Sequence, residues 1–189
     1  MQGKSRYHQS QQQLLSENDI VEAAKKDPKQ FEGLYTKYYE QIYRYVYQRM
    51  DDKEMAFDIT SQVFLKALTN LPKYEYKGVP FSSWLYRIAM SEVYQSFKDK
   101  KSTRTVNVDT NHVEDIIDDM EEDSTDSMRE LLIEVIGELP EIELQIIELR
   151  YFEKRSYREI GEILSMTENN AKVKAYRIVG KLKKSFSMR

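Results

Sequence analysis

Residues 156–177, SYREIGEILSMTENNAKVKAYR, constrain the fold most, because they contain two short amphipathic helical segments separated by a break at 165–167. Gly161 lies where two crossing helices must touch and where a larger side chain would not fit. Thr167 can cap the second helix, since its hydroxyl group can accept a bond from a free backbone N–H group. Apolar residues at helical spacing form the inner face of the first helix: Ile160, Ile163 and Leu164. The segment predicts a helix-turn-helix.

The second helix of this motif combines an apolar stripe with a basic surface. The stripe has helical spacing and consists of Ala171, Ala175, Ile178 and Leu182. From Lys172 to Arg189 there are seven Lys or Arg and no Asp or Glu, although the net charge of the chain is −3. Two such helices usually form a hairpin whose charges are solvated. Here the charge of the second helix is almost entirely basic and the motif is a helix-turn-helix, and this combination favours DNA binding.

The exposed side chains of the second helix have the chemistry that a major groove requires. Asn can bind adenine through two hydrogen bonds, Val can contact a thymine methyl group, and Lys and Arg can reach guanine or phosphate. The predicted DNA-contacting residues are Thr167, Glu168, Asn169, Asn170, Val173, Lys174, Tyr176 and Arg177.

The charge of the chain is distributed in three blocks. Residues 1–105 carry a net charge of +4, residues 106–130 a net charge of −9, and residues 131–189 a net charge of +2. The middle block has few apolar residues, so we expect it to stay unfolded, with at most a transient helical turn around Val113, Ile116 and Ile117. The predicted organisation is a disordered tail at 1–15, a domain at 16–105, a flexible acidic linker at 106–127 and a helix-turn-helix domain at 128–189.

The first domain is predicted to contain four helices. We expect one from a cap at Ser16 through Lys26, and a second that begins at Phe31. A third opens at Asp51-Asp52 and ends at Pro72, and its apolar positions are Ala56, Ile59, Val63, Ala67 and Leu71. After a loop at 73–80, the fourth runs from Phe81 to about Lys101, with Trp84 in the core. The fold class is therefore all-α, with two small helical domains.

Composition argues against several other classes of protein. The chain has no Cys, which excludes a disulfide framework and a thiolate metal site. No apolar run approaches the length of about 18 residues that spans a bilayer, and residues 1–13 are polar, so we expect a cytoplasmic protein. His8 and His112 lie in polar segments without a phosphate-binding loop. We expect no catalytic residues, no bound metal and no cofactor, and hence no enzyme.

Both halves of the chain resemble the extracytoplasmic-function sigma factors, a bacterial family. In the first half the resemblance rests on FEGLYTKYYEQIYRYV, AFDITSQVFLKAL and FSSWLYRIA. In the second half it rests on ELPEIELQIIELRYFEKRSYREIGEIL and the basic helix that follows. The resemblance implies a region 2-like domain and a region 4-like domain in a promoter-specificity subunit of RNA polymerase.

The resemblance also assigns roles to residues of the first domain. It places Asp58, Ser61, Gln62 and Leu65 against the clamp helices of the largest polymerase subunit, although many members have Gln-Glu where this chain has Ser61-Gln62. It places the loop 73–80 and the outer face of the fourth helix at the −10 element, where a flipped base needs stacking surfaces and cations. The residues of suitable type are Lys73, Tyr74, Tyr76, Lys77, Arg87 and Lys98, and Ser91 is assigned to the same surface. Ser91 replaces the Asn of many members.

The predicted function is that of an alternative sigma factor, which binds core RNA polymerase, recognises a −35 and a −10 element and assists promoter melting. The family implies an anti-sigma factor as a further partner. It also implies that the acidic linker runs toward the active-site cleft and RNA-exit channel, where its charge could substitute for that of RNA. One alternative is a free-standing helix-turn-helix regulator that binds operators without polymerase. Another is an interaction protein that holds a partner without starting transcription.

Overall fold

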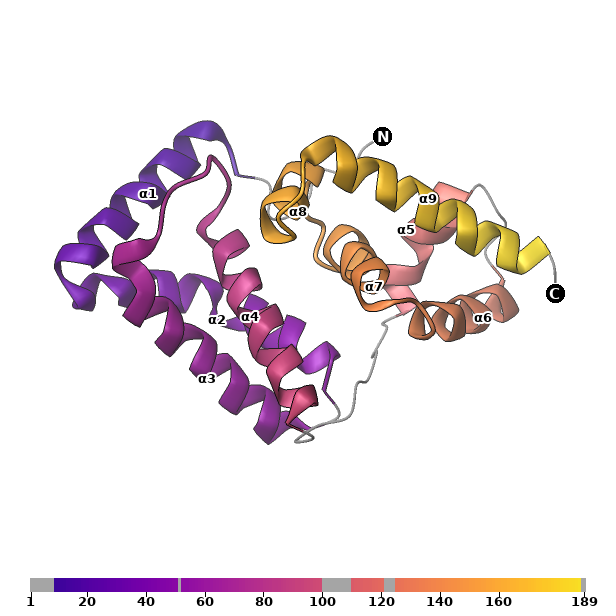
Figure 1. Ribbon diagram of the computed structural model, residues 1–189, viewed down its shortest axis with the longest axis horizontal. Helices are drawn as coiled ribbons and strands as arrows, with labels where there is room; N and C mark the ends of the chain where they lie inside the picture. Colours follow the sequence, from indigo (N-terminus) through magenta and orange to yellow (C-terminus); the bar gives the residue numbers. More distant parts are fainter. Residues whose placement is uncertain (1–8, 51, 100–109, 121–124, 188–189) are drawn as a thin grey trace. The chain divides into compact units, whose positions relative to one another are not determined.

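The computed structural model describes residues 9–50, 52–99, 110–120 and 125–187. Within these residues the regular elements are all helices, which confirms the all-α prediction (Figure 1). They divide into two compact units, an N-terminal unit with described residues 9–99 and a C-terminal unit with described residues 110–187. No helix in the described part of the chain is long and apolar enough to cross a membrane.

The described residues of the N-terminal unit form four α-helices and two short 3₁₀ turns. In chain order they are α1 (Gln11–Lys26), η1 (Pro28–Gln30), α2 (Phe31–Gln48), α3 (Lys53–Asn70), η2 (Leu71–Lys73) and α4 (Phe81–Lys98). Asp52 caps α3 by accepting from the backbone N–H groups of Glu54 and Met55 at 2.8 and 3.0 Å. The apolar positions predicted for this helix are all buried, which confirms its orientation.

The first helix begins earlier than predicted. Ser10 caps it, because its side chain accepts from the N–H group of Gln13 while the Gln13 side chain accepts from the N–H group of Ser10. Residues 11–15 are part of α1, and Leu14 among them is buried. The prediction of a disordered tail over 1–15 is therefore wrong for residues 11–15. Residues 1–8 lie outside the described residues. The predicted helix end before Asp27-Pro28 is confirmed.

Aromatic rings form the core of the N-terminal unit where α4 begins. The Phe81 ring is in contact with four others at centroid distances of 5.1–6.4 Å: Phe31, Tyr38, Tyr74 and Trp84. Trp84 is half-buried and also packs against Tyr74 at 5.2 Å, which agrees with its predicted place in the core. Tilted and edge-to-face arrangements of this kind stabilise a core beyond the area that they bury.

Within residues 110–120 and 125–187, the C-terminal unit forms five α-helices and one π-helical turn. They are α5 (Thr110–Met120), α6 (Asp126–Gly137), α7 (Glu141–Ile147), the π-helix η3 (Glu148–Phe152), α8 (Tyr157–Ile163) and α9 (Glu168–Ser187). The helix-turn-helix predicted at 156–177 is α8 and α9. Ser165 adopts a positive φ of 55° at the predicted break, and Ala171, Ala175, Ile178 and Leu182 are buried as expected.

Helix α5 corrects the prediction of a flexible linker over 106–127, since residues 110–120 are helical and pack within the C-terminal unit. Its apolar residues do not form a transient turn but are almost fully buried: Val113, Ile116, Ile117 and Met120. The segment has too few apolar residues to fold alone, but α6, α9 and η3 supply the surface that covers its apolar face. Residues 106–109 and 121–124 lie outside the described residues.

Acidic residues of α5 are paired with the rest of the C-terminal unit. Glu114 accepts from Arg129 at 2.6 Å, and Asp115 forms an ion pair with Lys154. Asp119 accepts from the Tyr151 hydroxyl group at 2.7 Å. Burial, and then this hydrogen bond, raise the pKa of Tyr151 above its ordinary value, so its hydroxyl group remains a donor. Part of the negative charge of the predicted linker therefore has a structural role.

Gly161 allows the close contact between α8 and the start of α9. A Cβ atom at this position would lie 2.7 Å from the Met166 carbonyl oxygen and 3.2 Å from the Glu168 nitrogen, and both are backbone atoms. We therefore expect Gly161→Ala to lower the free energy of unfolding of the protein by about 1–3 kcal/mol, because the backbone of the turn must move. Urea unfolding followed by circular dichroism measures the change.

Gly180→Ala is the matched control, since Gly180 is also helical and nothing lies within 4 Å of a Cβ atom there. Alanine is the better helix former, so this variant should be as stable as the wild type or more stable by about 0.5–1 kcal/mol. Equal stability of Gly161→Ala and wild type would contradict the close helix contact.

Candidate nucleic-acid and protein interfaces

The outer face of α9 presents the predicted DNA-contacting residues. Thr167 Oγ1 accepts from the N–H group of Asn170 at 3.2 Å, which confirms the predicted cap. Val173 is 36% exposed and Tyr176 60% exposed, while the side chain of Lys174 is half-buried. The remaining predicted residues are exposed: Thr167, Glu168, Asn169, Asn170 and Arg177. All eight therefore lie on or beside one accessible surface at the N-terminal half of the helix.

Three residues that were not predicted from the sequence support this surface. The Tyr157 ring of α8 lies 6.4 Å from the Tyr176 ring, and the Arg150 guanidinium group lies over Tyr157 at 4.6 Å. Burial raises the pKa of Tyr157, and the nearby Arg150 charge opposes that rise. Lys172 lies 6.0 Å from the centre of the Tyr176 ring. Tyr176 therefore contacts one ring and one cation, and a second cation lies over that ring, an arrangement suited to a phosphate backbone.

A buried ion pair holds the turn that precedes α8. Arg155 is 1% exposed, donates from Nη1 to Glu159 at 3.2 Å and from Nε to the Glu153 carbonyl oxygen at 2.9 Å. The Glu159 side chain also accepts from the N–H group of Ser156, while the Ser156 hydroxyl group accepts from the N–H group of Glu159. This capping box fixes the start of α8, and α8 in turn fixes α9.

The loop between α3 and α4 does not present Tyr74 as predicted. Its side chain is only 8% exposed, because the ring packs against Phe81 and Trp84. Tyr74 is therefore a core residue, and its prediction as a stacking surface for a base is wrong. Of the other predicted loop residues, Tyr76 is half-buried, whereas Lys73 and Lys77 are exposed.

The outer face of α4 carries one stripe of exposed side chains. Arg87, Ser91 and Lys98 are exposed as predicted, and their spacing places them on one side of the helix. Tyr94 is 63% exposed and shares this side, since it follows Ser91 by three residues and precedes Lys98 by four. Tyr94 was not predicted, although its helical spacing from Ser91 and Lys98 places it on the same side of the helix.

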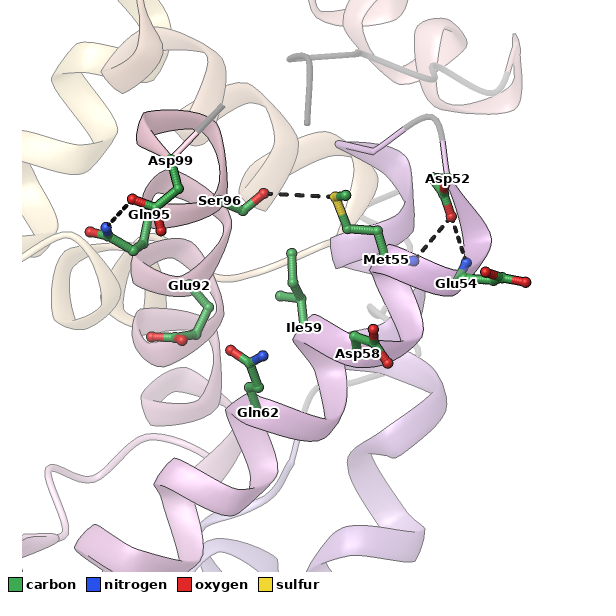
Figure 2. Close-up of a pocket in the computed structure, with 10 residues that line it drawn as sticks. All are labelled: Asp52, Glu54, Met55, Asp58, Ile59, Gln62, Glu92, Gln95, Ser96 and Asp99. Carbon is green, nitrogen blue, oxygen red and sulfur yellow. Dashed lines mark hydrogen bonds between the residues drawn. The ribbon is translucent and has the colours of Figure 1, made fainter. Parts of the chain in front are cut away.

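Helix α3 presents its predicted protein-binding residues along two grooves. Asp58 and Gln62 face a groove of about 350 Å³ between α3 and α4 (Figure 2). None of the ten described residues that line it is basic, and five are acidic: Asp52, Glu54, Asp58, Glu92 and Asp99. Lys66 pairs with Glu92 at 2.6 Å, which offsets part of this charge. The groove favours a basic partner.

Ser61 and Leu65 line a second groove, between α2 and α3. It measures about 520 Å³ and contains the apolar side chains of Phe31, Tyr35, Phe64, Leu65 and Leu68. Leu65 is 63% exposed, and Phe57, one turn before Ser61 on the same helix, is 54% exposed. Exposed apolar side chains next to a groove are typical of a protein-binding surface. Phe57 was not predicted, although it lies four residues before Ser61 and therefore on the same side of α3.

Comparisons with known proteins find family matches in both units of the chain. The Sigma-70 region 2 family matches residues 34–103, and the Sigma-70 region 4 family matches residues 129–182. The chain is 30% identical over 153 residues to the ECF RNA polymerase sigma factor BldN of Streptomyces coelicolor, an alignment that covers 79% of this chain and 57% of BldN. It is 29% identical to the RNA polymerase sigma factor SigZ of Bacillus subtilis, with 80% of this chain and 84% of SigZ covered.

The fold is similar to that of a solved structure of another protein. The structure of CnrH in complex with the cytosolic domain of CnrY matches with a TM-score of 0.60 at 15% sequence identity. The match covers 92% of this chain and 98% of CnrH. At this identity the likeness shows the all-α fold.

The buried ring of Tyr74 has a measurable consequence. We expect Tyr74→Ala to lower the free energy of unfolding by about 3–5 kcal/mol, because it leaves a cavity beside Phe81 and Trp84. Trp84 is the only tryptophan of the chain, so its fluorescence during urea unfolding reports on this cluster directly.

Tyr94→Ala removes a tyrosine of the same size from the exposed face of α4 and is the matched control. Its free energy of unfolding should stay within about 0.5 kcal/mol of the wild type. If Tyr74→Ala is as stable as Tyr94→Ala, the ring of Tyr74 is not part of the core.

Proposed function

We propose that this chain, which belongs to the extracytoplasmic-function family of RNA polymerase sigma factors, binds core RNA polymerase and directs it to promoters with specific −35 and −10 elements. The observation that carries the proposal is the presence of both sigma regions in one chain, each with an accessible surface of suitable chemistry. The polymerase supplies the catalysis, and the chain supplies promoter specificity inside the cytoplasm. The alignment spans only 57% of BldN, so the surfaces of this chain, rather than the likeness to BldN, support the proposal.

In this proposal the C-terminal unit reads the −35 element. The exposed start of α9 enters the major groove, where Asn169, Lys174 and Arg177 have the side chains that bind base edges or phosphates. Tyr176, which contacts the Tyr157 ring and Lys172, contributes to backbone contacts. The rigid support of α9 by α8 limits the entropy lost on binding.

The N-terminal unit binds the −10 element through α4 and the loop before it. Arg87 and Lys98 supply cations for the DNA backbone, and Tyr94 on the same stripe supplies an exposed ring for stacking. The loop residues Lys73, Tyr76 and Lys77 border the pocket for a flipped base. Tyr94 takes the place of Tyr74 in this surface, because the ring of Tyr74 is buried.

Core polymerase binds to α3 and the two grooves beside it. The clamp helices of the largest subunit contact Leu65 and Ser61 through the apolar groove, and Asp58 and Gln62 through the acidic groove. A contact across an apolar groove gives affinity, and acidic side chains at its edge favour a basic partner and its orientation.

A regulatory protein is a further expected partner. The fold resembles that of CnrH, whose structure contains the cytosolic domain of CnrY, and this supports an anti-sigma factor as a partner of this chain. The alternative of a free-standing operator-binding regulator is not favoured, because the first half of the chain matches Sigma-70 region 2 rather than a ligand-binding or dimerisation domain.

Replacing Lys174 and Arg177 together by Ala tests the −35 surface. Each residue that reads a base should contribute about 1–3 kcal/mol to promoter binding by the holoenzyme, and each that meets phosphate should contribute less. Electrophoretic mobility shift with wild-type and scrambled −35 elements measures the loss, and run-off transcription measures its consequence.

Lys184→Ala is the control, since Lys184 is exposed on α9 about 10 Å further from the helix N-terminus than Arg177. It should bind the promoter nearly as well as the wild type. Wild-type promoter binding by the double variant would show that α9 does not read the −35 element.

The polymerase surface is tested by Leu65→Ala and Asp58→Ala, which alter the two sides of α3 separately. Each should lower affinity for core polymerase about tenfold or more, a change of about 1.4 kcal/mol. The effect of Asp58→Ala should shrink in high salt, because salt screens charge pairs, while the effect of Leu65→Ala should persist. Fluorescence anisotropy of labelled protein with core enzyme gives both affinities.

Thr69→Ala is a suitable control on the same helix, since Thr69 is exposed. Its hydroxyl group donates a hydrogen bond to the carbonyl oxygen of Leu65, four residues earlier, at 2.8 Å. It should bind core polymerase like the wild type. If all three variants bind core equally well, α3 is not the polymerase surface.

A further inference from the structure

Helix α1 contacts both ends of the loop that precedes α4. The family match for region 2 begins at residue 34, so α1 lies before it. In the N-terminal unit, α1 runs beside η2 and the loop that leads into α4 (Figure 1). Two side chains of α1, Lys25 and Glu17, provide these contacts.

Lys25 holds the first end of the loop. Its Nζ atom donates to the Tyr74 carbonyl oxygen at 2.8 Å and to Glu22 at 2.7 Å. The same ammonium group lies 5.8 Å from the centre of the Tyr74 ring. Because this ring is itself packed on Phe81 and Trp84, the chain is fixed where it leaves η2.

Glu17 holds the second end. Its Oε2 atom accepts from the backbone N–H group of Phe81 at 2.7 Å, although Glu17 is 64 residues away in sequence. Helix α4 has Pro80 before its first residue and no side-chain cap of its own, so Glu17 takes that role. A carboxylate at a helix N-terminus is further favoured by the helix dipole.

The Glu17 carboxylate is itself fixed, since it is only 4% exposed. Its Oε1 atom accepts from the Tyr38 hydroxyl group and from Lys37 Nζ at 2.5 Å, both on α2. Lys37 supplies a positive charge next to a buried negative one, which offsets the cost of burying the carboxylate. Helix α1 therefore ties α2 to the start of α4.

Between these two anchors the loop divides into a buried and an accessible part. Val79 and Pro80 are buried next to Phe81, and Gly78 turns the chain with a φ of 72°. Glu75 and Lys77 are exposed, and Tyr76 is half-buried. Between the two anchors, the accessible residues are therefore confined to the stretch 75–78, whose ends are fixed by α1.

We propose that Lys25 and Glu17 are positioning residues for promoter melting, which hold the 75–78 stretch in the conformation that receives an unpaired base of the −10 element. This inference rests on the proposed function. A loop that is ordered before it binds loses less conformational entropy when it captures a base, so the capture contributes more to strand opening. Neither residue touches DNA; both act through the backbone of the loop.

The test uses holoenzyme with full-length Lys25→Met and Glu17→Gln. Methionine keeps the length of the side chain but cannot donate to the Tyr74 carbonyl oxygen, and glutamine keeps the shape of Glu17 without its charge. We expect each variant to slow open-complex formation on a duplex promoter about three- to tenfold, as followed by permanganate reactivity of −10 thymines. A promoter with a pre-melted −10 bubble should restore part of the loss, and affinity for core polymerase should stay at the wild-type level.

A second readout reports on the loop itself. Amide hydrogen exchange of residues 75–81, followed by mass spectrometry, should accelerate in Lys25→Met, while exchange in α2 and α3 stays unchanged. Lys26→Ala is the matched control, because Lys26 is the exposed neighbour of Lys25 in the last turn of α1. It should match the wild type in both measurements.

The outcomes separate this inference from the proposed function. If wild-type protein does not support transcription with core enzyme, the proposed function fails. If wild-type protein is active but both variants open duplex promoters within twofold of its rate, the positioning role is overturned. An equal loss of core binding and strand opening in both variants would also overturn it, since the effect would then be a general loss of structure.

Discussion

The first turn of α4 is the point on which the N-terminal unit depends. The Phe81 ring joins α2, α4 and the preceding loop in one aromatic cluster, while the Phe81 N–H group is bound by Glu17 of α1. Apolar packing and a charged hydrogen bond thus act on the same residue from different helices. This junction fixes the position of the exposed stripe of α4 and of the grooves beside α3, because both helices are packed against it.

The C-terminal unit also depends on the junction of two helices, but different contacts hold that junction. Gly161 sets how closely α8 meets α9, and the buried pair of Arg155 and Glu159 fixes the turn before α8. Helix α5 then covers the apolar surface left by α6, α9 and η3. Its pairing with Arg129, Lys154 and Tyr151 means that the acidic charge near residue 115 stabilises the unit. A role of this charge as a substitute for RNA must compete with those contacts.

Sequence periodicity predicted the elements whose apolar residues lie at regular helical spacing. Helices α3 and α9 were predicted with the right buried faces, and the break at Ser165 followed from the motif. The start of α1 could also have been found, because Ser10 and Gln13 have the spacing of a capping box. Helix α5 could not, since four apolar residues suffice for folding only when another element covers them.

Side-chain roles were harder to predict than helices, and tyrosine shows why. A tyrosine can bury its ring in a core or expose it for stacking, and local sequence does not distinguish the two. Tyr74 is buried because Trp84 and Phe81, seven or more residues away, meet its ring, whereas Tyr94 is exposed on α4. The contact from Glu17 to Phe81 is still less visible in sequence, since it spans 64 residues and joins a helix outside the region 2 match to one inside it. Residues that position a site from a distance are therefore found from the folded structure, where their partners can be seen.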